Sequence, residues 1–412
     1  MKYYILIISF LLTCLSSFGQ LTSLVIYDNN ESHQFGANNL LTAHKIIYQN
    51  LNEIIPTKLW DESNLLKKAG GISYRALRLG ATGFQIDVNT VLIQHEVFGH
   101  GSRMREFDYS NIKYTFNHIF PFNFGGTAGG RSSFPNSPTQ RILVSSGGVE
   151  GDLILSEKLE ESILITEELH YRQSSLFLVS RNNLLRYARR DIRNFGDISS
   201  YVNQINSKYS TTQNEISVRN IFNQGLVTLL NPLQLYASLN LGKDYLIDAS
   251  LTPMKLPFIK IEEVNYLPSL NYNLTPFGGE FIFNNHFVKD GKLLLLRARF
   301  GDSRFANFYG GTIKYLNWIN TESIKLNASI DLWNQPSYSI GSSNGLEQIN
   351  GGFGFMTKSS VNYFPVSKFH KIGIHGEIGY KTNGYVMGER LGQGLILRVG
   401  IAIKLNESSE GK

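Results

Sequence analysis

The feature that most constrains the fold is a regular alternation of apolar and polar residues in the second half of the chain. It is clearest over residues 323–332, where Ile, Leu and Ala alternate with Ser, Lys, Asn and Asp. Successive side chains of a β-strand point to opposite faces, so a period of two predicts a strand with one apolar and one polar face. Further strands are predicted at residues 233–241, 264–274, 278–288, 292–300, 309–320, 352–364, 372–380 and 395–405.

Long strands with one apolar face, tight turns and frequent aromatic residues are typical of an outer-membrane β-barrel. Asp290-Gly291 is a pair that closes tight hairpins. In a barrel the apolar face would meet lipid, and the polar face would line the lumen, with Lys325, Asn327, Ser329, Asp331, His375 and Glu377 among its residues. We therefore predict an antiparallel β-barrel of the outer-membrane type over residues 216–412. A soluble β-sandwich is the alternative, because it also buries one face of each sheet.

The first half of the chain shows the helical period instead. Apolar residues three and four apart predict helices at residues 40–54, 62–79, 86–104, 149–171 and 174–194, with a short one at 201–208. Ser, Thr and Asn become frequent near residues 209–224. We predict an α+β fold in which a helical region, residues 20–215, precedes the barrel.

The first 19 residues resemble a secretory signal peptide. Lys2 precedes an apolar stretch, and Ser17-Phe18-Gly19 forms a small-x-small cleavage site. The only cysteine, Cys14, lies in this segment, so the mature chain would contain no disulfide; lipidation of Cys14 is the alternative to removal. The predicted location is the outer membrane of a Gram-negative envelope. The net charge of +6 has no basic run behind it, so nucleic-acid binding is not expected.

The strongest chemical signal is the stretch His95-Glu96-Val97-Phe98-Gly99-His100. Zinc accepts neutral imidazole nitrogens and carboxylates, and a catalytic zinc keeps one position open for water. His95 and His100 are the predicted metal ligands. Glu96 is the predicted general base, because a carboxylate that is not a ligand can accept the proton of the attacking water.

The spacing of the two histidines requires a distorted helix. Residues five apart lie about 140° apart around an α-helix, too far to chelate one ion. A single wide turn that absorbs one extra residue would return His100 to the face of His95, and Gly99 eases such a distortion. The sequence thus predicts a helical bulge at the motif.

His-Glu-x-x-Gly-His resembles the motif of the dipeptidyl peptidase III metallopeptidases, and residues 95–100 match it at each defined position. The resemblance covers this motif alone and implies a zinc-dependent peptidase. In that family, a glutamate from a Glu-Glu-x-x-Ala-Glu type motif on a following helix completes the zinc site, and this chain lacks that second motif.

Glu150, which lies among small residues at a similar separation, is the candidate third ligand. Asp152 and Glu157 are the competing carboxylates. Arg103 comes near the face of His95 about two turns on, once the extra residue of the bulge is counted, and Arg105 follows it. Arg103 is the candidate for binding a substrate carboxylate or a developing oxyanion, with Arg105 as the alternative. The glycine-rich run at residues 124–131 reads as a flexible connector, with a substrate-binding edge over the site as the alternative.

Taken together, the sequence predicts an exported Zn²⁺ metallopeptidase attached to an outer-membrane barrel, with a peptide or protein as substrate and membrane lipid as partner. The competing hypothesis is a non-enzymatic barrel for transport or assembly, in which the helical half is a plug and any metal is structural. A third keeps the enzyme but makes the β half a soluble substrate-binding domain.

Overall fold

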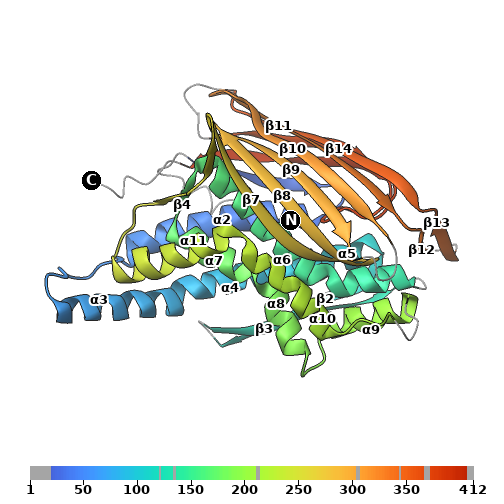
Figure 1. Ribbon diagram of the computed structural model, residues 1–412, viewed down its shortest axis with the longest axis horizontal. Coiled ribbons are helices and arrows are strands. Elements are labelled where there is room, and N and C mark those ends of the chain that lie inside the picture. Colours follow the sequence, from blue (N-terminus) through green and yellow to red (C-terminus); the bar gives the residue numbers. More distant parts are fainter. Residues whose placement is uncertain are drawn as a thin grey trace.

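The computed structural model describes residues 20–119, 122–132, 136–209, 214–302, 307–342, 345–365 and 372–405. The predicted signal peptide and Cys14 lie outside these ranges. The protein has a mixed α+β fold, in which a large curved antiparallel sheet lies over a layer of helices (Figure 1).

The main sheet has ten strands, nearly all contributed by the second half of the chain. Their order is β1 (Gln20–Asp28), β16 (Gly394–Leu405), β15 (Ile372–Lys381), β14 (Gly352–Tyr363), β11 (Ile324–Gln335), β10 (Tyr309–Asn320), β9 (Lys292–Gly301), β8 (Gly278–Lys289), β7 (Val264–Thr275) and β6 (Ile259–Ile261). All neighbours are antiparallel. A hairpin of β12 (Tyr338–Ser342) and β13 (Gly345–Ile349) extends the connection between β11 and β14.

Most of the predicted strands are confirmed, as is the tight turn at Asp290-Gly291, where both residues adopt positive φ. The closed barrel is wrong, because the sheet ends at β1 on one side and at β6 on the other without joining. Helix α2 (His33–Ile54) packs beside β1, and the 3₁₀ helix η3 (Leu226–Leu230) packs beside β7. Helices thus pack near both ends of the open sheet.

A long helical run carries the His-Glu motif. It consists of α3 (Leu65–Arg78), η1 (Leu79–Gly83), α4 (Phe84–Ile93), η2 (Gln94–His100) and α5 (Gly101–Glu106), which follow one another without a break. Both η1 and η2 are π-helical. The predicted helix at residues 86–104 is therefore confirmed as the later part of a longer run.

Helix α6 (Pro138–Thr166) contacts both η2 and the sheet strands β7 and β9. It begins at a capping box formed by Ser137 and Gln140, with a proline in its first turn. The predicted start at Val149 is too late, because the glycines before it resemble a loop in sequence. In the structure Gly147 and Gly148 lie inside the helix, where they permit close contact with η2.

The remaining helices follow α6 on the side of the molecule away from the outer face of the sheet (Figure 1). They are α7 (Tyr171–Arg181), α8 (Asn183–Asp191), α9 (Asp197–Tyr209), α10 (Val218–Gly225), α11 (Pro232–Leu239) and the π-helix η4 (Asn240–Ile247). The strand predicted at residues 233–241 is wrong. Asn231 caps this segment by accepting a hydrogen bond from the Leu233 amide, and Pro232 occupies the first turn, so helix-start chemistry overrides the alternation.

A separate hairpin of β2 (Tyr109–Ile119) and β3 (Phe122–Ser132) packs against η2. The glycine-rich run predicted to be a connector therefore belongs to a strand. A short pairing of β4 (Glu168–Leu169) with β5 (Met254–Lys255) completes the described strands.

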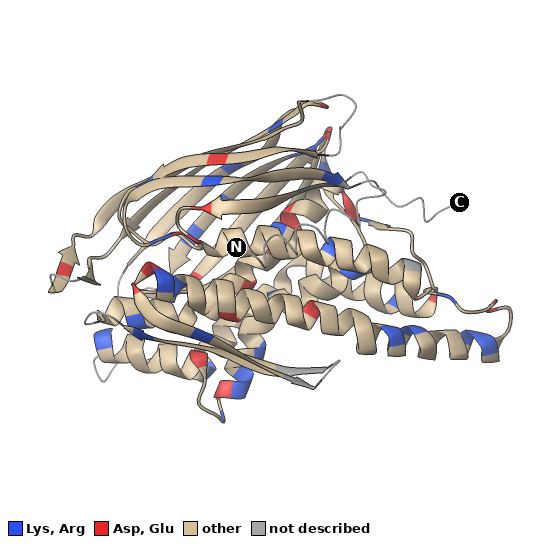
Figure 2. Cartoon of the chain, turned by 180° about the vertical axis from the view of Figure 1, so that it is seen from behind, with Lys and Arg blue, Asp and Glu red and all other residues tan. Residues whose placement is uncertain are grey.

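The two faces of the main sheet have opposite character. The polar residues of the alternating pattern face the helices and are mostly buried, whereas large apolar residues are exposed on the outer face. Figure 2 shows that most strand positions carry no charge. Exposed residues of the outer face include Phe283, Phe300, Tyr309, Ile313, Trp318, Ile330, Leu332, Phe353, Ile374, Ile378, Tyr380 and Leu395. Among the described residues, no helix is both long enough and apolar enough to span a bilayer.

Candidate metal centre

The two histidines of the motif face each other across a π-helical turn. Segment η2 adds the extra residue per turn that the five-residue spacing requires, so the predicted bulge is confirmed. The centroids of the His95 and His100 rings lie 4.9 Å apart. Both side chains are buried.

A carboxylate from a distant part of the chain completes the group. Asp197 is the first residue of α9, and its Oδ2 lies 3.1 Å from Nε2 of His95 and 3.4 Å from Nε2 of His100. The three ligand atoms all lie within 4.8 Å of one another, and the group could hold a metal ion. Ligands at about 2.0–2.1 Å from a tetrahedral zinc lie roughly 3.3 Å from one another, so these distances fit a common ion.

Each imidazole is held in place by a hydrogen bond from its other nitrogen. His95 Nδ1 donates to Asp152 Oδ2 at 2.8 Å, and His100 Nδ1 donates to the Val144 carbonyl at 2.6 Å. Both acceptors belong to α6. Such partners fix the tautomer and orientation of metal-binding histidines, and here they direct both Nε2 atoms toward Asp197. The Tyr187 ring stacks on His95 with the ring centroids 4.6 Å apart.

Glycines allow η2 and α6 to approach closely enough for these contacts. A Cβ atom on Gly99 would lie 2.7 Å from the Gly147 carbonyl oxygen, and one on Gly148 would lie 2.3 Å from Nε2 of His95. Even alanine would therefore force the two helices apart. The small residues near Glu150 serve this close approach.

Glu96 lies beside the histidines but outside the ligand group. Its side chain is 3 % exposed, and its Cγ lies against Gly126 of β3. Burial raises the pKa of the Glu96 carboxyl, while the nearby His95 and His100 oppose this shift. A carboxylate with a raised pKa beside a prospective metal site is well suited to accept a proton.

The electrostatics of the metal-free group are those of a tight ion cluster. Burial opposes charge on Asp197, but the adjacent His100 and His95 hold the pKa of its carboxyl below the ordinary value. Burial likewise disfavours the charged form of His100. The negative charge of Asp197 and its hydrogen bond to the ring together outweigh this effect and raise the pKa of the His100 imidazole. A divalent cation would displace the protons from the His95 and His100 imidazoles, because a metal ion binds these side chains in their deprotonated forms.

The structure places the predicted third ligand elsewhere. Both carboxylate oxygens of Glu150 bind the Arg103 guanidinium, at 2.6 and 3.1 Å, and the Gly388 amide donates to Oε1 at 2.8 Å. Arg103 is itself buried and also pairs with Glu106 at 2.7 Å, so it is not open to a substrate. Glu150 therefore binds Arg103 and not the imidazoles. The carboxylate that contacts both imidazoles is that of Asp197.

The two competing carboxylates also have other roles. Asp152 binds the outer nitrogen of His95, which makes it an orienting partner and not a member of the ligand group. Glu157 pairs with Arg297 of β9 at 2.8 Å, on the side of α6 that faces the sheet.

Sequence reasoning missed Asp197 because nothing in the spacing links it to the motif. It follows His95 by 102 residues, and its position depends on how α9 packs against α6. The one local signal is the Gly196-Asp197 pair at the start of a helix, which does not by itself indicate a ligand.

The comparisons with known proteins add no family. No protein-family model matches the chain, and neither the curated proteins nor the solved structures give a match.

Proposed function

We propose that this protein is a zinc-dependent hydrolase of the bacterial envelope that cleaves peptide bonds and is held at the outer membrane by its sheet. His95, His100 and Asp197 are the metal ligands, and Glu96 is the general base. The proposal rests on one observation: two imidazoles, each held by a hydrogen bond from Nδ1, direct their Nε2 atoms toward the same carboxylate oxygen of Asp197.

Three protein ligands suit a catalytic site better than a structural one. Structural zinc is enclosed by four protein ligands, whereas catalytic zinc has three and leaves a position for water. The side chain of Asp197 is 30 % exposed, so the group is reached from solvent on that side. This favours hydrolysis over a purely structural metal.

The roles of the residues follow from their positions. A bound zinc ion would lower the pKa of a coordinated water toward neutrality and polarise a substrate carbonyl. Glu96 accepts the proton of the attacking water and returns it to the leaving amine. Asp152 keeps His95 in the tautomer that presents Nε2, and the Val144 carbonyl does the same for His100.

Membrane attachment is supported by the outer face of the sheet. Exposed Leu, Ile and Phe side chains cover strands of 10–12 residues in the centre of the sheet, and Tyr and Trp side chains occur among them. Apolar bands flanked by aromatic residues are typical of outer-membrane proteins. Helices in place of further strands would then complete the wall, with lipid as the partner of the apolar face.

Replacing Glu96 by Gln tests the mechanism. The variant should retain the metal content of the wild type, measured by plasma mass spectrometry, because Glu96 is not a ligand. Its chelator-sensitive cleavage of a fluorogenic peptide library should fall by about 10²–10⁴-fold, the usual contribution of a general base. Glu263→Gln, on an exposed turn, is the matched control. Undiminished cleavage by the Glu96→Gln protein would refute the mechanism.

A further inference from the structure

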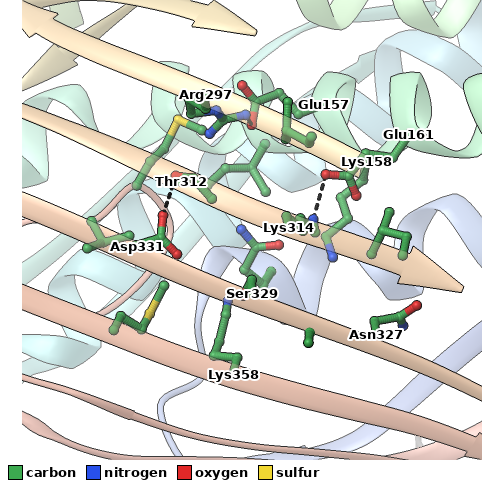
Figure 3. Close-up of a pocket in the computed structure, with 18 of the residues that line it drawn as sticks. Glu157, Lys158, Glu161, Arg297, Thr312, Lys314, Asn327, Ser329, Asp331 and Lys358 are labelled. Carbon is green, nitrogen blue, oxygen red and sulfur yellow. Dashed lines mark hydrogen bonds and ion pairs between the residues drawn. The ribbon is translucent and has the colours of Figure 1, made fainter. Parts of the chain in front are cut away.

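Two adjoining cavities lie between α6 and the inner face of the sheet, away from the candidate metal centre. Their volumes are about 120 and 320 Å³. Lys158 of α6 lines both, together with Glu161, Asn327 and Ser360. In Figure 3 the Lys158 side chain extends from the helix into the space beneath the strands.

The smaller cavity is balanced in charge. Apart from Lys158, each of its cationic residues lies within ion-pair distance of a carboxylate. The pairs are Arg297 with Glu157 at 2.8 Å, Arg299 with Glu280 at 3.6 Å, Lys314 with Glu161 at 2.5 Å and Lys358 with Glu389 at 2.8 Å. Two of these pairs, Arg297 with Glu157 and Lys314 with Glu161, join the sheet to α6.

The larger cavity has an excess of positive charge. Lys45 of α2, Lys158 of α6 and Lys325 of β11 line it, and none of them forms an ion pair with any residue of the described ranges. Its two carboxylates pair with cations other than these lysines, Glu161 with Lys314 and Glu377 with Arg398, and Arg398 also pairs with Asp28 and Glu389. Three lysines from three different elements thus line one space, and none of them has an ion-pair partner among the described residues.

Such an arrangement favours an anionic occupant. Like charges in a partly buried space repel one another, and removing an ammonium group from water without a partner costs free energy. The remaining walls carry hydroxyl and amide groups, including Ser162, Thr166 and Asn362, which can bind the oxygens of an anion or of a polar group attached to it. A volume of about 320 Å³ lies at the lower end of the range for small-molecule sites.

We propose that the larger cavity is a binding site for a phosphate-bearing ligand, held by Lys45, Lys158 and Lys325. Lysine binds phosphate as a compact charge with three donors, and three of them match a group of two negative charges and several acceptor oxygens. The phosphate belongs either to a small solute or to the headgroup of a phospholipid. The site is independent of the metal centre and does not require the hydrolase to be active.

Titration of the purified full-length protein with inorganic phosphate, followed by calorimetry, tests the proposal. The wild type should show saturable binding that chloride at equal ionic strength does not reproduce. Lys158→Gln and Lys45→Gln should each weaken binding by about tenfold or more, since a hydrogen bond to a charged group contributes about 1.5–3 kcal/mol and 1.4 kcal/mol is tenfold. Lys243→Gln, at an exposed lysine of η4, should bind as the wild type.

A second measurement distinguishes the source of the phosphate. Solvent extraction of the purified protein should yield more lipid phosphorus from the wild type than from Lys158→Gln if the ligand is a headgroup, and equal amounts if it is a solute. His100→Ala should bind phosphate as the wild type, which separates this site from the metal centre. The proposal fails if phosphate does not bind saturably and no excess lipid is extracted, or if Lys45→Gln, Lys158→Gln and Lys325→Gln all behave as the wild type.

Discussion

At the scale of single residues, the structure assigns different tasks to carboxylates that look alike in sequence. Glu150 and Asp152 are two residues apart on α6, yet one neutralises a buried arginine and the other orients an imidazole. Asp197 is the one that both imidazoles meet. These assignments depend on which way each side chain points from its helix, and they can be tested separately.

The first prediction contrasts Asp197→Asn with Glu150→Gln. Asp197→Asn should lose most of its bound metal, because it removes a charged ligand. Glu150→Gln should keep its metal but lose up to about 3–5 kcal/mol of unfolding free energy, because Arg103 would remain buried with only Glu106 as counter-charge. Metal analysis and denaturant unfolding measure the two effects. Loss of metal in Glu150→Gln but not in Asp197→Asn would reverse the assignment.

The second prediction concerns Asp152, which touches His95 without joining the ligand group. Asp152→Asn should weaken metal binding by about 10–100-fold, the usual effect of losing an orienting partner, while leaving the stoichiometry at saturating metal unchanged. Competition with a chromophoric chelator measures the affinity. An unchanged dissociation constant would show that the Asp152 contact does not support the site.

At the scale of elements, the sequence predicted what local chemistry determines and missed what packing determines. The bulge at His95–His100 followed from the five-residue spacing and Gly99, because both are local. The long strands followed from their alternation. The segment after Asn231 was misassigned because its alternation also fits a helix whose start is set by a cap and a proline. Asp197 and the open sheet could not be predicted, since both depend on contacts between distant segments.

The contact between η2 and α6 gives a prediction with an internal control. Gly99→Ala should destabilise the protein by about 1–3 kcal/mol and reduce metal occupancy, because its methyl group would meet backbone atoms of α6. Gly80→Ala, in the π-helix η1, meets nothing within 4 Å and should be neutral or stabilising by about 0.5–1 kcal/mol. Thermal unfolding and metal analysis of both variants test this. Equal effects at the two glycines would contradict the role of close packing.

At the scale of the whole molecule, the main sheet has a largely polar inner face and an apolar outer face. The inner face of the sheet meets the helices through ion pairs such as Lys314 with Glu161, and the outer face exposes aliphatic and aromatic side chains. This is the reverse of a soluble sheet, whose exposed face is polar. The prediction that each strand has one apolar and one polar face is thus confirmed, although the sheet does not close into a barrel.

Ile330, near the middle of β11, tests whether lipid covers the outer face. Its side chain is 49 % exposed. Ile330→Arg should lower the free energy of folding into lipid vesicles by about 2–4 kcal/mol, as expected for a charge at the bilayer midplane. Gln348→Arg, on the hairpin outside the main sheet, should have little effect. If Ile330→Arg is as stable as the control and dissolves without detergent, the outer face is exposed to water.

The pairing of β1 with β16 has a consequence for the order of assembly. Gln20 lies opposite Leu405, so the first strand of the main sheet to be synthesised finds its neighbour only after every other strand of the sheet has followed. Until then β1 has an unsatisfied edge and α2, which packs on it, has an incomplete support. Pairings between such distant segments form slowly. The junction of β1 and β16 should therefore be the last part of the main sheet to form, so it stays open longest while the chain folds.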